Sequence, residues 1–214
     1  MTDSYRAADA SHRYVLDLVR AADRDRFLAA LFAPEPARRE LLALLAFDRE
    51  LARTPHVTRE PLLARIRLQW WRDAVAEAVG GGSPRAQPIV ESLSETARRH
   101  GLAASGFDAL IDAREEEIEG PLDVVRAGHA LADLQLAVLG PQDDASRRAA
   151  RLVGAAWLMG EGPERDALLA EARALRAAVD PRTLPVLLPA LSLGGTVAWA
   201  RPLAYWWAAR RGRY

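Results

Sequence analysis

The chain has 214 residues, of which 50% are hydrophobic and 27% are charged, so it can bury a substantial core and is not expected to be disordered. Its 29 basic residues, all arginine, balance 29 acidic residues, and the resulting net charge of zero argues against a nucleic-acid-binding protein. Cysteine is absent, which excludes disulfides, thiolate metal ligands and a cysteine nucleophile.

Apolar residues recur at helical spacing along nearly the whole chain, and no stretch shows the period of two typical of a strand. Glycine and proline divide this pattern into segments, and Thr58 with Pro61 marks the start of the fourth. In chain order, the predicted helices span residues 10–21, 24–32, 36–53, 59–79, 86–99, 105–118, 122–139, 144–159 and 164–179, followed by a helical C-terminal region. The sequence therefore predicts an all-α protein, a single-domain helical bundle over residues 1–214.

The segment from residue 183 to residue 200 carries no charge, and its length reaches the lower limit for a membrane span. Pro185, Pro189 and the pair Gly194-Gly195 interrupt it, which favours two short buried helices over a membrane-associated element. Residues 1–6 contain no apolar run of the kind found in a signal peptide. We therefore expect a cytoplasmic protein.

The C-terminal region combines aromatic and basic side chains. Tyr205, Trp206 and Trp207 are followed by Arg210 and Arg211. Aromatic residues beside arginine suit a membrane surface or a protein interface, so these five residues are the candidate interaction site. The alternative is that the aromatic rings pack against the bundle and the arginines end the last helix.

Four stretches occur in an order that resembles the squalene/phytoene synthase family. The first is Asp-Arg-Asp-Arg-Phe-Leu at residues 23–28, and the second is Ile-Arg-Leu-Gln-Trp-Trp-Arg-Asp at residues 66–73. The third is Leu-Ile-Asp-Ala-Arg-Glu at residues 110–115, and the fourth runs from residue 128 to residue 157. The second and third are most similar to a subgroup related to a mitochondrial complex I assembly factor. The resemblance implies a trimmed prenyl (isoprenoid) synthase-type fold and a subgroup regarded as largely non-enzymatic.

The resemblance also shows where the chain departs from the enzymes of the family. Those enzymes follow Ala-Phe-Cys-Arg with an Asp-Asp-x-x-Asp motif that holds Mg²⁺ on a prenyl diphosphate. Here the three aspartate positions are Ala52, Arg53 and His56. Mg²⁺ prefers oxygen ligands, and a cation at position 53 would repel it by roughly several kcal/mol in a cleft of low dielectric constant. We therefore expect no prenyl coupling, no catalytic residues and no cofactor.

The second Asp-rich motif of the family would follow Gly154. In this chain Gly160, Gly162 and Pro163 interrupt the helix there, and Asp166 is a lone acidic candidate. Mg²⁺ would be needed only under the alternative interpretation, in which the chain is an active prenyltransferase.

A group of arginines could bind a phosphate or diphosphate directly, because guanidinium groups bind such anions in a bidentate manner. The candidate ligand-binding residues are Arg49, Arg53, Arg65, Arg67 and Arg72. The alternative is that they form ion pairs between helices, with Asp48, Glu50 or Asp73 as partners. Trp70 and Trp71, on the same predicted helix, are expected to lie in the core.

An acidic cluster lies between residues 108 and 119, where several carboxylates are four residues apart. The candidate metal ligands are Asp112, Glu116 and Glu117, and Glu117 corresponds to an aspartate of the family. The alternative is a solvated helix end with Arg114 as counter-ion. Asp73 and Glu77 offer a second pair at helical spacing, as a surrogate metal site or as part of a solvated face.

These observations leave three hypotheses. The first is a non-catalytic protein, a pseudoenzyme, that acts in respiratory complex I assembly by binding a protein partner or a membrane surface at the periphery of the inner membrane. The second is an active prenyltransferase that uses the acids of residues 108–119. The third is a carrier of an isoprenoid lipid.

Overall fold

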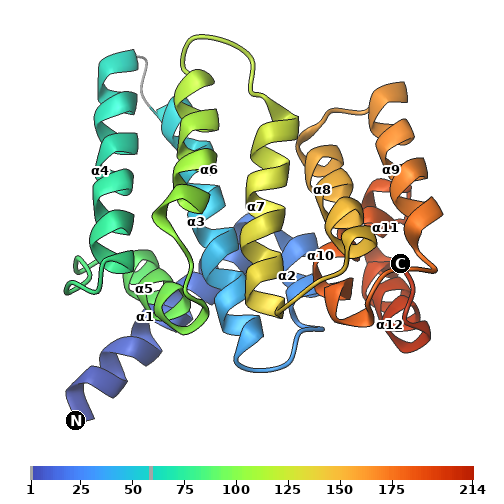
Figure 1. Ribbon diagram of the computed structural model, residues 1–214, viewed down its shortest axis with the longest axis horizontal. Helices are drawn as coiled ribbons and strands as arrows, with labels where there is room; N and C mark the ends of the chain where they lie inside the picture. The colour runs from blue at the N-terminus through green and yellow to red at the C-terminus, as the bar shows by residue number, and fades with distance from the viewer. Residues whose placement is uncertain (1, 58–59) are drawn as a thin grey trace. The chain divides into compact units, whose positions relative to one another are not determined.

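The computed structural model describes residues 2–57 and 60–214, which form helices and no strand, as predicted from the sequence (Figure 1). The chain divides into two compact units. Unit 1 comprises Met1–Ala22 and Arg39–Asp123, and unit 2 comprises Asp23–Arg38 and Val124–Tyr214. Each unit thus combines two separate segments of the chain, and the single domain expected over residues 1–214 stays a prediction.

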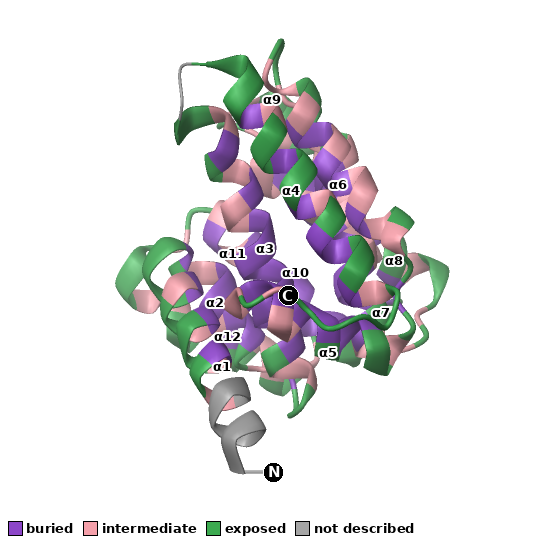
Figure 2. Cartoon of the chain, turned by 90° about the vertical axis from the view of Figure 1, so that its left-hand side faces the viewer, coloured by how far each residue is buried: buried purple, intermediate pink, exposed green. Residues whose placement is uncertain are grey.

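The described residues of unit 1 form α1 (Thr2–Ala22), α3 (Ala37–Val57), α4 (Pro61–Val79), α5 (Pro88–His100) and α6 (Ala104–Glu116), of which α3 contributes only from Arg39 onward. Its core contains three aromatic rings. The ring of Phe47 on α3 meets Trp71 on α4 and Phe107 on α6 edge to face, with centroid distances of 5.6 and 5.7 Å. The first half of α3 is buried over most of its length (Figure 2). α3 is therefore the helix around which α4 and α6 are organised.

A buried carboxylate joins α3 to α5. The side chain of Glu40 is only 5% exposed, and its Oε1 accepts a hydrogen bond from Nη1 of Arg99 at 2.7 Å. Its Oε2 lies 2.8 Å from Nε2 of His100. Because a buried carboxylate without partners is costly, these two side chains at the end of α5 fix its position against α3.

The helix α3 is longer than the sequence predicted, because it continues through Pro55 to Val57. Proline lacks the N–H that would bond to the carbonyl four residues earlier, so a helix usually stops before it. Here Pro55 lies in the last turn, and the hydroxyl of Thr54 donates to the carbonyl of Glu50 at 3.0 Å. The additional turn carries His56. The fourth helix begins at Pro61, and the predicted start at Thr58 lies outside the described residues.

Unit 2 begins with one helix from the first third of the chain and continues with the C-terminal helices. Its elements are α2 (Arg24–Ala30), α7 (Val124–Leu139), α8 (Asp144–Leu158), α9 (Pro163–Leu175), η1 (Pro181–Thr183), α10 (Leu184–Leu187), α11 (Pro189–Leu193), η2 (Ala198–Ala200) and α12 (Arg201–Arg211). α7 and α8 approach closely at Gly128 and Gly154, where a Cβ built on Gly154 would lie 2.5 Å from the carbonyl oxygen of Gly128. Only glycine permits this backbone contact.

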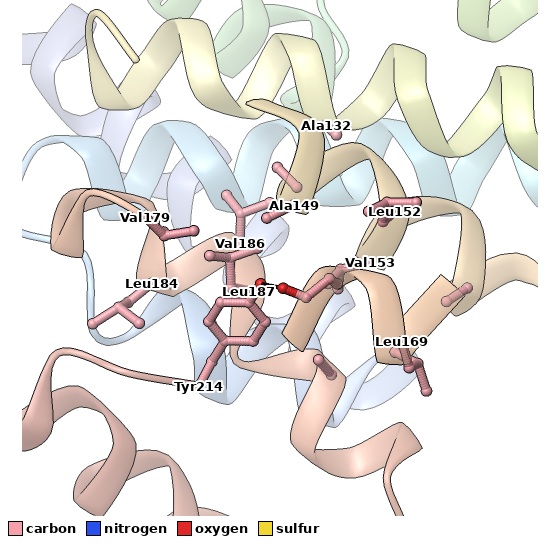
Figure 3. Packing of buried hydrophobic residues seen from close by; sticks show 14 of the residues in the cluster. Ala132, Ala149, Leu152, Val153, Leu169, Val179, Leu184, Val186, Leu187 and Tyr214 are labelled. Atoms are coloured by element: carbon pink, nitrogen blue, oxygen red, sulfur yellow. Dashed lines mark hydrogen bonds between the residues drawn. The ribbon is translucent and has the colours of Figure 1, made fainter. Parts of the chain in front are cut away.

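The larger hydrophobic cluster of unit 2 contains buried residues of α7, α8, α9, α10 and α11 together with Tyr214 (Figure 3). The ring of Tyr214 packs in this cluster, and its hydroxyl donates to the carbonyl of Ala172 at 2.6 Å. Burial raises the pKa of Tyr214 to about 12.

The uncharged segment from residue 183 to residue 200 folds largely as predicted. Its first half forms the short helices α10 and α11, which are mostly buried. Within the described residues, no helix has the length and apolar character needed to cross a membrane. The end of the segment differs from the prediction, because Val197 and Trp199 are exposed.

Candidate functional site

The three positions that replace the aspartates lie in the last two turns of α3. Arg53 donates from Nη1 to Oε1 of Glu50 at 2.9 Å, so it forms an ion pair within its own helix. Nε2 of His56 lies 3.6 Å from Oε1 of Glu117, which caps the end of α6. Ala52 offers no ligand atom. The structure therefore brings together His56 and Glu117, but the set of donors there is one carboxylate, one imidazole and one guanidinium.

A pocket of about 360 Å³ lies beside this position, between the end of α3 and the first half of α4. It is lined by Glu50, Arg53, Thr54, Val57, Arg67, Trp70 and Trp71. Of these, the sequence singled out the arginines and the tryptophans; Val57 lay beyond the predicted end of its helix. The volume falls at the small end of the range for ligand sites in proteins.

The two tryptophans of α4 have different environments. Trp71 is buried in the core, as expected, whereas Trp70 is 36% exposed, so the expectation of a core position for Trp70 is wrong. The rings meet edge to face at 5.0 Å, and the guanidinium of Arg85 lies 5.2 Å from the Trp70 ring. Trp70 therefore lines the pocket and is partly exposed to solvent, whereas Trp71 packs in the core.

Among the candidate arginines, Arg72 is the most fully paired. It donates to Asp108 at 3.0 Å, to Asp112 at 2.8 Å and to Glu115 at 3.2 Å, all on α6. Partial burial opposes its charge, but the hydrogen bonds and charges of Asp112 and Asp108 raise the pKa of Arg72 above its usual value. Arg72 therefore connects α4 to α6 through ion pairs. The alternative of ion pairs between helices describes Arg72, but its partners lie on α6 and are not the predicted Asp48, Glu50 or Asp73.

The other arginines divide into paired and unpaired groups. Arg65 pairs with Glu119. Arg67 lines the pocket and forms no ion pair within the described residues. The Nε atom of Arg49, on α3, is buried and has no hydrogen-bond partner among the described residues. Arg67 is thus the candidate whose charge is available to a ligand in the pocket.

The acidic cluster does not present a set of free carboxylates. Asp112 is held by Arg72, and Glu117 accepts from Nη1 of Arg114 at 3.0 Å. The guanidinium of Arg114 is itself buried and lies 3.5 Å from Asp48 on α3. Among residues 9–57 and 60–214, whose side chains are described, no three histidine, aspartate or glutamate side chains are grouped as a metal site would require. The metal alternative for Asp112, Glu116 and Glu117 therefore gains no support from the geometry.

The second acidic pair, Asp73 and Glu77, is also engaged. Gln69 donates to Asp73 at 2.7 Å, and Arg85 donates to both oxygens of Glu77 at 2.7 and 2.8 Å. The hydrogen bonds from Arg85 lower the pKa of Glu77. Arg85 lies after the glycine-rich turn that follows α4, and no sequence spacing had pointed to it as a partner.

The candidate interaction residues near the C-terminus fall into two groups. Tyr205 is fully buried and bonds to Ser192, so it does not belong to an exposed surface. Trp206 and Trp207 are exposed, and Arg210 and Arg211 lie over their rings. Of the packing alternative, the buried ring describes Tyr205 alone, whereas Arg210 and Arg211 do lie in the last turn of α12, as that alternative expected.

Comparison with known proteins identifies the family. The family described as Squalene/phytoene synthase matches residues 19–159. The chain belongs to the squalene/phytoene synthase family. Its fold is similar to the crystal structure of squalene synthase HpnC from Alicyclobacillus acidocaldarius, with a TM-score of 0.68, 16% identity and coverage of 96% of this chain and 95% of that one. The fold is therefore the squalene synthase type of the isoprenoid synthase fold.

The curated relatives carry a different description from that of the family. The chain is 33% identical over 109 residues to "NADH dehydrogenase (ubiquinone) complex I, assembly factor 6" of Rattus norvegicus. The matched region covers 51% of this chain and 32% of that relative. It is 30% identical over 106 residues to the protein of that name in Homo sapiens, and this match covers 50% of this chain and 32% of the human protein. The chain thus matches about a third of the length of these relatives.

Proposed function

We propose that this protein is a non-catalytic member of the squalene/phytoene synthase family that acts in the assembly of respiratory complex I by binding a protein partner. The observation that carries this proposal is the ion pair of Arg53 with Glu50 where the family's enzymes have paired aspartates. This pair places a cation beside the one carboxylate of the same helix turn, which disfavours a metal ion at that position.

The donor set does not fit the Mg²⁺ that prenyl diphosphate ionisation requires. Mg²⁺ demands near-octahedral oxygen coordination. Of the three positions that replace the aspartates, Arg53 contributes a guanidinium and His56 an imidazole. The nearby carboxylate of Glu117 already accepts a hydrogen bond from Arg114. A Mg²⁺ ion here would have to displace two arginines from their carboxylates.

The rival hypothesis of a transferase that uses the acids of residues 108–119 meets the same difficulty. Asp108, Asp112 and Glu115 converge on Arg72, so an oxygen of each carboxylate is already bonded to a cation that a metal ion would have to displace. Moving Arg72 away from these carboxylates would also remove the ion pairs between α4 and α6.

The assembly role rests on the relatives' printed name and on an exposed apolar surface. Leu62, Leu63, Ile66 and Trp70 are exposed on α4, and their spacing places them along one side of that helix. Exposed apolar groups of this kind commonly mark protein interaction sites. In this proposal the protein acts in the cytoplasm or at the periphery of the inner membrane.

Two measurements test the proposal. The first follows diphosphate release from farnesyl or geranylgeranyl diphosphate with Mg²⁺, where no turnover above buffer is expected. The second compares the amount of assembled complex I on native gels in a deletion strain complemented with the wild-type chain or with Ile66→Asp. A matched Ala76→Asp variant places the same charge at an exposed position farther along α4.

The proposal predicts reduced complex I in the deletion strain, rescue by wild type and Ala76→Asp, and poor rescue by Ile66→Asp. Metal-dependent turnover would contradict the non-catalytic part. Normal complex I in the deletion strain would contradict the assembly part.

A second candidate function is the binding of an isoprenoid diphosphate without catalysis. It is favoured by Arg67, whose charge has no ion-pair partner among the described residues and which lines a pocket with two tryptophans. Farnesyl diphosphate should then raise the melting temperature equally with Mg²⁺ and with a chelator, and Arg67→Gln should abolish the rise. Inorganic diphosphate serves as the control for a purely ionic effect.

A further inference from the structure

The helix α12 presents its large apolar residues to the outside. Leu203, Trp206, Trp207 and Arg210 follow the i, i+3, i+4, i+7 spacing that places side chains on one face. All four are exposed, and each tryptophan is 46% exposed. Next to this face, Trp199 in η2 is 83% exposed, the highest value among the large hydrophobic residues. We call Trp199, Leu203, Trp206, Trp207, Arg210 and Arg211 the α12 face.

The opposite side of α12 fixes its orientation. Tyr205 is fully buried, and its hydroxyl lies 2.6 Å from that of Ser192 on α11. Burial raises the pKa of Tyr205 well above its usual value, so this buried contact stays uncharged. Arg201 donates to Asp25, in the first turn of α2, at 2.6 Å. The helix therefore cannot rotate to bury its tryptophans without breaking these bonds.

The arginines near the C-terminus differ in whether a carboxylate neutralises them. Arg182 and Arg201 pair with Asp180 and Asp25. Arg210, Arg211 and Arg213 form no ion pair among the described residues, and residues 181–214 contain no aspartate or glutamate. The local charge is therefore positive on a molecule whose net charge is zero.

The guanidinium groups and the indole rings form one continuous surface. The guanidinium carbon of Arg210 lies 5.4 Å from the centroid of the Trp206 ring, and that of Arg211 lies 4.8 Å from the Trp207 ring. At these distances cation–π attraction favours this arrangement of the side chains. A partner for this surface must accept indole rings and supply negative charge within the length of one short helix.

We propose that the α12 face binds the surface of an anionic lipid bilayer. Tryptophan favours the headgroup level of a membrane, where the ring is buried and the N–H stays hydrated, and arginine attracts anionic headgroups. The unneutralised arginines supply the charge complementarity. A bilayer also accepts a ring as exposed as Trp199 without a shaped pocket. This role does not depend on the proposed absence of catalysis.

The test is sedimentation of the full chain with vesicles of phosphatidylcholine alone or of phosphatidylcholine mixed with phosphatidylglycerol. Binding to the mixed vesicles is expected, with weaker binding at high salt. Because each basic side chain near such a surface contributes about 1 kcal/mol, Arg210→Gln with Arg211→Gln should lower the partition at least about tenfold. Trp206→Ala with Trp207→Ala should lower it as well.

The control variant is Arg98→Gln with Arg147→Gln, which removes the same charge from exposed positions on α5 and α8. It should bind as wild type does. The proposal is overturned if mixed vesicles do not bind the chain, if neutral vesicles bind it equally well, or if the control loses as much binding as the α12 variants. It is also overturned if the α12 variants lose an acidic protein partner while vesicle binding is unchanged.

Discussion

The close approach of α7 and α8 predicts a large effect from a single methyl group. In Gly128→Ala, the new Cβ would lie 2.4 Å from the backbone nitrogen of Ala155 and 2.6 Å from its Cα. Ordinary contacts begin near 3.4 Å, so the helices must separate by about 1 Å. The atoms in the way belong to the backbone and cannot rotate aside.

The magnitude follows from two opposing effects. Overpacking costs about 1 to 3 kcal/mol, and a backbone clash belongs at or beyond the upper end of that range. Replacing glycine by alanine within a helix returns about 1 kcal/mol. We therefore expect the free energy of unfolding to fall by about 2 kcal/mol and the melting temperature by about 4 to 8 °C.

Urea unfolding of wild type, Gly128→Ala and a control measures this difference. The control is Gly120→Ala, because nothing lies within 4 Å of a Cβ at Gly120. Its stability should stay within about 0.5 kcal/mol of wild type. If Gly128→Ala also stays within that limit, with an unchanged dependence on urea concentration, the inference of a tight backbone contact is wrong.

Three further predictions concern charged and titratable groups. Arg72→Gln should lower the free energy of unfolding by about 1 kcal/mol at low salt and by less at high salt, because salt screens ion pairs with partly exposed carboxylates. Equal losses at both salt concentrations would contradict the ion-pair explanation. Glu40→Gln should lower stability by about 2 kcal/mol, since Arg99 and His100 lose a buried acceptor charge, whereas the exposed Glu95→Gln should change it little in the same urea titration. The folded state keeps the Tyr214 hydroxyl protonated, so its contribution to stability is complete below pH 10 and is lost between pH 10 and 12. Tyr214→Phe should therefore make the free energy of unfolding fall less steeply in this range, by up to about 1.4 kcal/mol per pH unit. An unchanged slope in the variant would contradict this reasoning.

The fold could be predicted largely from local patterns in the sequence. Helical periodicity and the positions of glycine and proline determined the helices, since both act within a few residues. The predicted helix ends at residue 53, whereas α3 continues through Pro55 to Val57, because a proline in the last turn removes only one hydrogen bond. The side-chain bond of Thr54 to Glu50 is a local feature that could have been considered.

The site was harder to predict, because its partners are distant in sequence. Arg72 is 36 to 43 residues from the carboxylates that it binds, and helical spacing contains no information on such pairs. The same limit applies to Arg85 and Glu77. The different environments of Trp70 and Trp71 depend on which face of α4 meets α3, and adjacent residues on a helix point in different directions. The site-residue roles stay predictions.

The pairing of Arg53 with Glu50 has an evolutionary consequence. Reversion of Arg53 to aspartate would leave Glu50 without its cation and set two carboxylates side by side in the same turn. His56 reverted alone would face Glu117 in the same way. Each of these two single substitutions is therefore electrostatically unfavourable unless Glu50 or Glu117 changes with it. A change of this sequence into the Asp-Asp-x-x-Asp motif of the family's enzymes would therefore need coupled substitutions at these positions and at their acidic partners.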